Sequence, residues 1–257
     1  MLPGTPLRPP PESETVQAHG ADGPAPAGCV TVAVSLYNYA AFVLEALDSV
    51  RAQSHAALDL IVVDDASTDE GPEMVARWLA AHHGRFRSVR LLRHPRNRGL
   101  SAARNTAFAA ARTEAVFVLD ADNLLYPSAI AKLSPLLDRS GAAVAYSQLA
   151  FFGRESGLGY AAEWDRDLFR QGNYVDAMAL VRRSAWAQVG GYAPLDLGWE
   201  DYDLWLSFIE QGLAGVFLPE ILCRYRVHGQ SMLRTVTDAQ GQRVRAQLAR
   251  RHPWLEL

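Results

Sequence analysis

The stretch CVTVAVSLYNYAAFVLEALDSVRAQSHAALDLIVVDD, residues 29–65, decides the fold class. It opens with an apolar, β-branched run at 29–36 and closes with a second one at 58–65, both typical of buried strands. The residues between them include an apolar set at helical spacing: Phe42, Val43, Ala46, Leu47 and Val50. A strand, a helix and a second strand in this order form a unit whose strands can lie parallel. The stretch therefore predicts an α/β fold.

The alternation continues on the C-terminal side. After a turn at 66–72 we expect a helix at 73–83, a strand at 88–94, a helix at 99–112 and a strand at 114–122. Crossovers of this length allow the strands to lie parallel, and the right-handed crossover rule then places helices on both faces of the sheet. We therefore expect a Rossmann-like, mostly parallel central sheet. Further on, the pattern is less regular and residues 151–173 stay unassigned. There we expect helices at 127–139, 184–192 and 200–212 and strands at 142–148, 174–183 and within 213–232.

Composition divides the chain into segments. Half of the 14 prolines precede Gly28, so residues 1–27 are expected to be a disordered extension, and no apolar core of a signal peptide is found there. Residues 28–240 are expected to form one domain. Residues 241–257 remain as a C-terminal tail.

Charge and residue usage exclude several classes of protein. A net charge of −3 over 257 residues argues against a general nucleic-acid binder, and no apolar run approaches the length of a membrane span. The two cysteines, Cys29 and Cys223, cannot form a disulfide framework, which favours a reducing compartment. We therefore expect a cytoplasmic location, with peripheral contact at the inner face of the membrane compatible with the sequence.

Acidic residues follow the predicted strands. Asp64 and Asp65 end one strand, and Asp120 and Asp122 end another; the first strand ends near Ser35. Ligands of open α/β sheets bind beyond the carboxyl ends of the strands, and clustered carboxylates there can share Mg²⁺ or Mn²⁺. The alternative is that these acids form turns or cap helices.

Three further positions carry open interpretations. Glu200, Asp201 and Asp203 begin an apolar helix, where acids either complement the helix dipole or supply a general base. His228 is either a metal ligand or an ordinary packing residue. Arg104, with Asn105 beside it, either meets a phosphate or ribose or lies on an exposed helix face.

The order of motifs resembles glycosyltransferase family 2, whose members have the GT-A fold. The resemblance covers Val30 to Met232 and rests on VAVSLYNYAAFVLEALDSVRAQ, LIVVDDASTDEG, NRGLSAARNTAF, VFVLDADN, VGGY…GWEDYDLWLSF and YRVHGQSM. It implies a nucleotide-diphosphosugar donor, expected to be UDP-linked, a bound Mg²⁺ or Mn²⁺, and transfer that inverts the anomeric centre by direct displacement. The acceptor could be a glycan, a lipid-linked sugar or a small molecule. The resemblance also implies that residues 28–123 form the nucleotide-binding half of the domain and residues 124–240 the acceptor half.

The resemblance also implies roles for the donor-binding residues. The backbone around Ser35 and Tyr37 would pack against the base, and Asp65 would accept a hydrogen bond from a uracil-type imide. Arg104 would lie near the nucleotide, and Glu200 would belong to the nucleotide-sugar site.

The remaining implied roles concern chemistry. Asp120 would face the ribose and donor sugar, Asp122 would bind the metal, and His228 would complete the metal site in the manner of some relatives. Asp201 would be the catalytic base.

The chain departs from the family pattern at two places. Ala66 follows the acids where many members have glycine, and we expect an ordinary backbone conformation there. No Q-x-x-R-W signature follows the Glu200–Asp201 pair, which argues against processive polymer synthesis.

Two alternatives are open. A haloacid-dehalogenase-type phosphohydrolase would need a catalytic lysine, for which Lys132 is the sole candidate. A non-catalytic nucleotide-sugar or glycan-binding protein on the same fold would not need Asp122 and Asp201.

Overall fold

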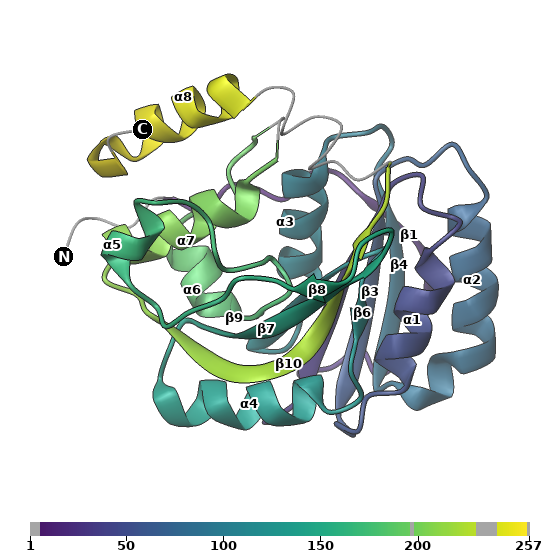
Figure 1. Cartoon of the computed structure of the whole chain (residues 1–257). Coiled ribbons are helices and arrows are strands. Elements are labelled where there is room, and N and C mark those ends of the chain that lie inside the picture. The colour runs from purple at the N-terminus through teal and green to yellow at the C-terminus, as the bar shows by residue number, and fades with distance from the viewer. Residues whose placement is uncertain (1–5, 196–197, 230–240, 256–257) are drawn as a thin grey trace.

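The computed structural model describes residues 6–195, 198–229 and 241–255, and it is built around one mixed sheet (Figure 1). The strand order is β1-β4-β3-β2-β5-β9-β7-β10-β6, with β8 paired to β7. Strands β4, β3, β2 and β5 are parallel to their neighbours in this run, and β7 and β10 are also parallel to each other. The strands are β1 (Glu14–Gly20), β2 (Val30–Leu36), β3 (Leu58–Asp64), β4 (Ser88–Arg93), β5 (Ala115–Asp120), β6 (Leu124–Leu125), β7 (Val144–Gly153), β8 (Gly157–Leu158), β9 (Leu180–Arg182) and β10 (Gly215–Val227).

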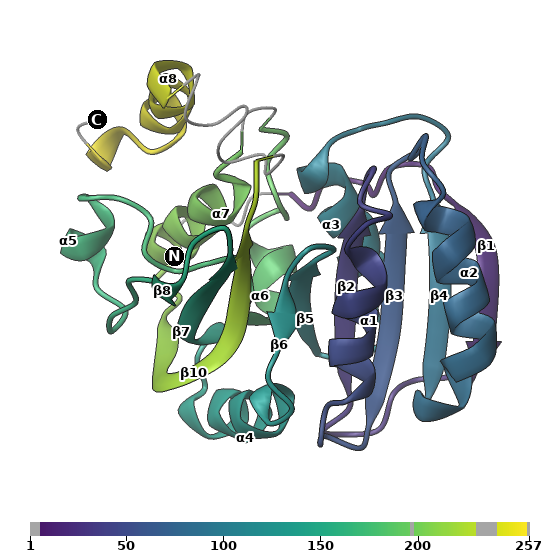
Figure 2. The same cartoon turned by 45° about the vertical axis from the view of Figure 1, so that its right-hand side comes forward.

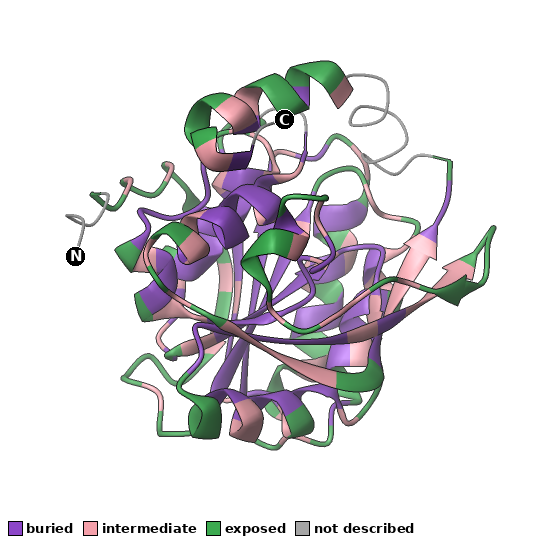
Figure 3. Ribbon diagram, turned by 60° about the vertical axis from the view of Figure 1, so that its left-hand side comes forward, coloured by how far each residue is buried: buried purple, intermediate pink, exposed green. Residues whose placement is uncertain are grey.

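Helices cover both faces of this sheet, as the alternation of strands and helices predicts (Figure 2). Successive strand residues point to opposite faces, so Val32 and Val34 of β2 enter one core while Ala33 enters the other. The first core lies under α1 (Val43–Arg51), α2 (Gly71–His82) and α4 (Ala129–Ser140). The second lies under α3 (Leu100–Ala110), α6 (Arg183–Gln188), α7 (Glu200–Glu210) and α8 (Gly241–Arg251). Strands β2 and β3 and most of β5 are buried between these cores, whereas β1, β8 and much of β10 are more exposed (Figure 3).

The N-terminal segment corrects one expectation, because part of residues 1–27 is ordered. Glu14–Gly20 forms β1, which pairs antiparallel with β4 from Glu14 opposite Arg93 to Gly20 opposite Ser88. Prolines flank this segment but none lies within it, so its backbone amides are free to join the ladder. Strand β1 covers what would otherwise be the open edge of β4.

The region after β7 departs further from the pattern. Residues 174–183 were expected to be one strand, but only Leu180–Arg182 pairs with neighbouring strands, as β9. The preceding residues bend, because the Asp176 carboxylate accepts from Met178 N and the Val175 carbonyl accepts from Trp205 Nε1. The unassigned stretch 151–173 contains the end of β7, β8 and the short helix α5 (Arg166–Phe169).

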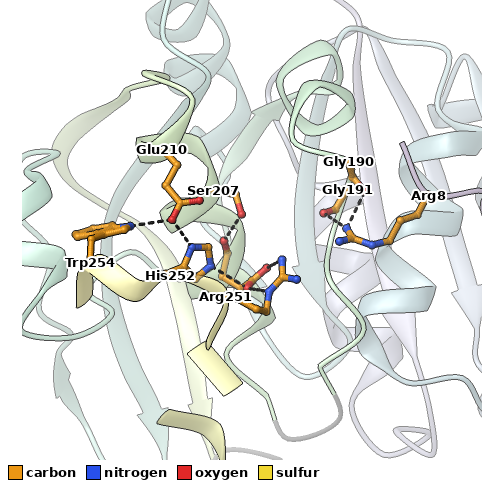
Figure 4. Close-up of polar contacts among 9 residues, drawn as sticks. Arg8, Gly190, Gly191, Ser207, Glu210, Arg251, His252 and Trp254 are labelled. Atoms are coloured by element: carbon orange, nitrogen blue, oxygen red, sulfur yellow. Dashed lines mark hydrogen bonds and ion pairs between the residues drawn. The ribbon is translucent and has the colours of Figure 1, made fainter. Parts of the chain in front are cut away.

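The C-terminal tail is helical where it is described. Val244 and Leu248 of α8 are fully buried. Arg251, the last residue of the helix, and His252 directly after it contact α7 (Figure 4). Residues 230–240, which include the end of the matched YRVHGQSM motif and the expected end of the domain, lie outside the described residues, as do 1–5 and 256–257. Among the helices that are described, none is long and apolar enough to cross a membrane.

Candidate functional site

The carboxyl ends of β2, β3 and β5 bring the predicted strand-end residues to one edge of the sheet. Ser35 lies opposite Asp120 in the pairing of β2 with β5, and Leu36 lies opposite Asp64 in the pairing of β2 with β3. Ser35 is half-buried, whereas Tyr37 just beyond the strand is 42% exposed. The parallel topology therefore forms the acidic edge that the sequence predicts.

Arg104 links two of the predicted acids. Its guanidinium donates to Asp120 Oδ1 at 2.8 Å and to Glu200 Oε1 at 2.5 Å, and it lies over the ring of Tyr192. The side chain of Arg104 is only 2% exposed, so it bridges α3, the end of β5 and the start of α7 from within the core. Burial opposes the charged guanidinium, but the neighbouring carboxylates outweigh it, and the pKa of Arg104 is raised. Arg104 is thus positioned to fix Asp120 relative to the helix that carries Asp201.

Asp201 lies in the first turn of α7, beside Glu200. Its Oδ1 accepts from the backbone N–H of Tyr202 at 2.7 Å, and its Oδ2 accepts from Asn173 Nδ2 at 3.0 Å. Burial and the negative charge of Glu200 raise the pKa of Asp201 to about 8. The residue before this pair, Trp199, has a φ of +61°, a conformation that is rare for a bulky residue and that turns the chain into the helix.

Asp122 and His228 come together from different strands. His228 Nε2 lies 2.8 Å from Asp122 Oδ2, and the imidazole packs against the rings of Tyr39 and Phe42. Arg226 supports the turn, since its backbone N–H donates to Asn123 Oδ1 and its Nε donates to the Asp122 carbonyl. Burial and the charge of Asp120 raise the pKa of Asp122, so the carboxylate gains from any nearby positive charge.

The pair fits a divalent cation as a partial donor set. The distance between these two atoms is that of a direct hydrogen bond or ion pair. Within the described ranges, no group of three or more His, Cys, Asp or Glu side chains is arranged to hold a metal ion. A carboxylate oxygen and an imidazole nitrogen are nevertheless donor types that Mg²⁺ or Mn²⁺ accepts, so the two side chains would supply part of a donor set.

Asp65 is held by its own loop. Its carboxylate accepts from His94 Nδ1 at 2.6 Å and from the backbone N–H groups of Arg98 and Gly99, at the entrance to α3. These bonds leave about one of the four lone-pair positions of a carboxylate for a ligand. Asp65 is also only 3% exposed.

The backbone at Ala66 corrects a second expectation. Its φ is +61°, in the left-handed region, and not the ordinary conformation that the sequence analysis assumes. The turn forces this value because Ser67 N must donate to Asp64 Oδ1 while Asp65 turns toward the loop at 98–99. Glycine would adopt this conformation without strain, and alanine does so at a cost.

Other residues singled out in the sequence have structural partners. Asn105 is buried, where it donates to the Tyr192 carbonyl and accepts from Trp186 Nε1 and Tyr192 N. Lys132 forms an ion pair with Glu220, at 43% side-chain exposure for each partner. Among the described side chains, Lys132 forms no ion pair with Asp120 or Asp122.

Two polar residues at the site were not predicted from the sequence. Asn173 holds Asp201, and burial together with the charges of Asp120 and Asp122 raises the pKa of Asp176 to about 7. The charge of Asp176 in turn adds to the raised pKa of Asp201. Asn173 and Asp176 lie in segments without a regular pattern, so periodicity carried no signal. An acid three residues after an asparagine, in a run otherwise rich in apolar residues, was the available clue.

A separate polar cavity of about 200 Å³ lies on the far part of α7, lined by Arg8, Val189, Ser207, Glu210, Gln211, Arg251 and His252. Arg8 donates to the Gly190 and Gly191 carbonyls there, while His252 contacts both Glu210 and Asp203 (Figure 4). The contacts of His252 thus fasten the C-terminal segment to α7, whereas Arg8 fastens the N-terminal segment to the Gly190–Gly191 turn that follows α6.

Comparisons with known proteins agree with this geometry. The chain is 29% identical over 204 residues to EpsE of Bacillus subtilis (strain 168), which covers 77% of this chain and 72% of that protein. The structure of S. aureus TarS in complex with UDP-GlcNAc superposes with a TM-score of 0.72 and 16% identity, over 87% of this chain and 66% of that one. The mannosyltransferase PcManGT from Pyrobaculum calidifontis, in complex with GDP-Man and Mn²⁺, superposes with a TM-score of 0.64 and 24% identity, over 90% of this chain and 65% of that one.

Coverage differs among these proteins. The chain spans 72% of EpsE, 20% of the uncharacterized protein y4gI of Sinorhizobium fredii (strain NBRC 101917 / NGR234), to which it is 32% identical over 187 residues, and about two thirds of the two solved structures. The structural likeness supports the fold. The model of glycosyl transferase family 2 matches residues 31–191, well over half of the sequence, and the chain belongs to that family.

Proposed function

We propose that the protein is an inverting glycosyltransferase that moves a sugar from a nucleotide-diphosphosugar, expected to be UDP-linked, to an acceptor hydroxyl. One observation carries this proposal. The buried Arg104 holds Asp120, on the donor side of the sheet edge, and Glu200, directly beside Asp201, in one fixed arrangement. A transferase that inverts by direct displacement needs a donor site and a base at a fixed separation.

Asp201 acts as the general base. In its ionised form it accepts the proton of the acceptor hydroxyl as the hydroxyl oxygen forms a bond to the anomeric carbon. The bond from that carbon to the diphosphate oxygen breaks in the same step, so the nucleoside diphosphate leaves with the electron pair and the configuration inverts. Asn173 donates to Asp201 Oδ2, and the backbone N–H of Tyr202 donates to Asp201 Oδ1. These two bonds fix the orientation of the carboxylate toward the approaching hydroxyl.

Asp122 and His228 would hold Mg²⁺ or Mn²⁺, which supplies positive charge to the leaving diphosphate when bound. The proximity and donor types of the two side chains support this assignment, as does the gain that positive charge brings to the buried Asp122. Asp120, partly exposed at 27% of its side chain, faces the ribose and donor sugar, and Arg104 keeps it in place.

The nucleotide base would lie against the end of β2. The backbone at Ser35 and the exposed Tyr37 offer a surface there, and Asp65 contributes its remaining lone pair to an imide. We propose a glycan, a lipid-linked sugar or a small molecule as the acceptor. We also propose a cytoplasmic location, with contact at the inner face of the membrane where the acceptor is lipid-linked.

Separating turnover from binding tests this function. Asp201→Asn should reduce the release of UDP or GDP from UDP-GlcNAc, UDP-glucose or GDP-mannose in the presence of saccharide acceptors by about 100-fold or more. Binding of the same nucleotides with Mn²⁺, measured by calorimetry, should be unchanged. Asp167→Asn, on the exposed surface of α5, is the matched control and should keep full turnover. Normal turnover of Asp201→Asn would remove that residue from the role of base.

A further inference from the structure

The segment from Asn173 to Ala179 connects the two halves of the proposed site. At its start, Asn173 donates to Asp201, and at its end the Ala179 carbonyl accepts from Val118 N of β5, two residues before Asp120. In between, the Val175 carbonyl accepts from Trp205 Nε1 of α7. The middle residue of this segment, Asp176, therefore lies between the base and the donor-side acids.

One of the two carboxylate oxygens of Asp176 accepts a hydrogen bond from the described protein. Its Oδ1 accepts from Met178 N at 2.8 Å, a local bond that fixes the side chain. Its Oδ2 accepts no hydrogen bond from any residue that the structure describes, although the side chain is only partly accessible. A partly accessible, rigid carboxylate oxygen without a donor is suited to bind a ligand donor group.

A structural role does not explain why this residue is an acid. The bond to Met178 N requires one oxygen, which asparagine or serine would supply without charge. Burial and the charges of Asp120 and Asp122 oppose the ionised form of Asp176, while Met178 N and Arg104 favour it. The bond to Met178 N therefore leaves the second carboxylate oxygen without a structural role among the described residues.

The surroundings restrict the chemistry of that ligand. A phosphate is disfavoured because it would add negative charge to a group of carboxylates. A neutral group that donates hydrogen bonds fits, and sugar hydroxyls are such donors. The segment that carries Asp176 pairs with Val118 of β5, two residues before Asp120, which places Asp176 toward the donor side.

We propose that Asp176 binds a hydroxyl group of the donor sugar through Oδ2 and so contributes to the choice of sugar. This inference rests on the proposed function. It assigns the recognition of the hexose to a residue separate from those expected to hold the nucleotide, the metal and the acceptor proton.

The test compares sugar nucleotides with the parent nucleotides. Wild type, Asp176→Asn and Asp176→Ala are titrated by calorimetry, with Mn²⁺, against UDP, UDP-GlcNAc, UDP-glucose, UDP-galactose, GDP and GDP-mannose. The best sugar nucleotide should lose about tenfold or more in affinity in Asp176→Ala, the scale of a hydrogen bond to a charged group. Affinity for the matching UDP or GDP should stay within about twofold, and the preference among the sugars should change in Asp176→Asn. Asp167→Asn serves as the control.

The other results overturn the assignment. Equal losses for the parent nucleotide and its sugar conjugate would show that Asp176 supports the metal or the fold. Unchanged donor affinity with a raised KM for the acceptor would place the hydroxyl on the acceptor. Asp176→Asn retains an oxygen for Met178 N and should fold, which thermal unfolding checks. Wild type that binds none of the six nucleotides would overturn the proposed function itself.

Discussion

Arg104 and Glu200, 96 residues apart in the chain, form a buried ion pair in which a guanidinium nitrogen donates to Glu200 Oε1 at 2.5 Å. The second terminal nitrogen of Arg104 donates to Asp120. One side chain thus joins α3, β5 and α7, and it places positive charge next to Asp201. Glu200 places negative charge next to the same residue, so the two partners act on the base in opposite directions.

This opposition predicts two pH profiles. The pKa of Asp201 is raised to about 8 by burial and Glu200 and is held down by Arg104. Because the base must be ionised, kcat should rise with pH and level off above about 8. Glu200→Gln should move this limb to lower pH and Arg104→Gln should move it to higher pH, as kcat measured from pH 6 to 10 would reveal. Shifts in the same direction would mean that the limb does not report Asp201.

The metal pair predicts a selective loss. Asp122→Ala and His228→Ala should each weaken the binding of UDP or GDP in the presence of Mn²⁺, by about 10- to 100-fold for the carboxylate, since the ion would lose a protein ligand. Binding measured in EDTA should be the same for the variants and wild type. Glu45→Ala is a useful control, because Glu45 pairs with Arg226 close by without contacting either proposed ligand. Equal Mn²⁺ dependence in all four proteins would place the ion elsewhere.

The strained turn predicts a stabilising substitution. At the φ of +61° observed for Ala66, glycine removes about 1–2 kcal/mol of steric strain from the folded state. The greater conformational entropy of glycine in the unfolded chain opposes this gain by about 0.5–1 kcal/mol. Ala66→Gly should therefore raise the free energy of unfolding by about 0.5–1 kcal/mol. Ala52→Gly, at an exposed residue with a φ of −78°, should give no gain. Urea denaturation measures both, and a less stable Ala66→Gly protein would contradict the account.

The contacts of the C-terminal segment predict how stability depends on pH. Burial lowers the pKa of His252, but Asp203 and Glu210 outweigh it and raise the value above 6.5. The contribution of His252 to the free energy of unfolding is therefore present below pH 6.5 and is lost as the pH rises through the folded pKa. Burial raises the pKa of Asp203, but His252 and Arg251 outweigh it and lower the value below 3.8, so that contribution is lost only as the pH falls through the folded value.

Substitution of His252 isolates the first of these effects. His252→Gln should lower the free energy of unfolding more at pH 5.5 than at pH 8.5, as denaturant titrations at the two pH values would measure. His55→Gln, at a histidine whose ring nitrogen bonds the Gly28 carbonyl and no carboxylate of the described residues, should show no such difference. An equal loss at both pH values would mean that His252 contributes by packing alone.

Much of the fold was predictable because two periodicities and a few turn signals determine it. The strands of the first half follow from apolar runs such as Val30–Leu36 and Leu58–Asp64, and the parallel topology then gathers Asp120 and Asp65 at one edge. Strand β1 was missed because its prolines lie on both sides of it, and composition averaged over 27 residues hides a seven-residue strand.

Less of the site was predictable, because it depends on contacts between distant segments. The family resemblance implies that Asp122 and His228 lie at one site, and the structure brings the two side chains to 2.8 Å. The sequence leaves the surroundings of Arg104 open between an exposed surface and a site, whereas the structure buries the side chain between two carboxylates. Asp176 escaped notice because its role depends on a bent segment whose shape is set by α7 and β5.

The most direct test of the central claim is ligand-dependent thermal stability. The protein would be heated with UDP, GDP, dTDP or CMP, and with common sugar conjugates of these nucleotides, each with and without Mn²⁺. The account predicts that one nucleoside diphosphate and its sugar conjugate raise Tm only with Mn²⁺, by an amount equivalent to about 2.7 kcal/mol at 100 times Kd. A folded sample whose Tm responds to none of these ligands, with or without Mn²⁺, would contradict the assignment of this edge of the sheet as a nucleotide-sugar site.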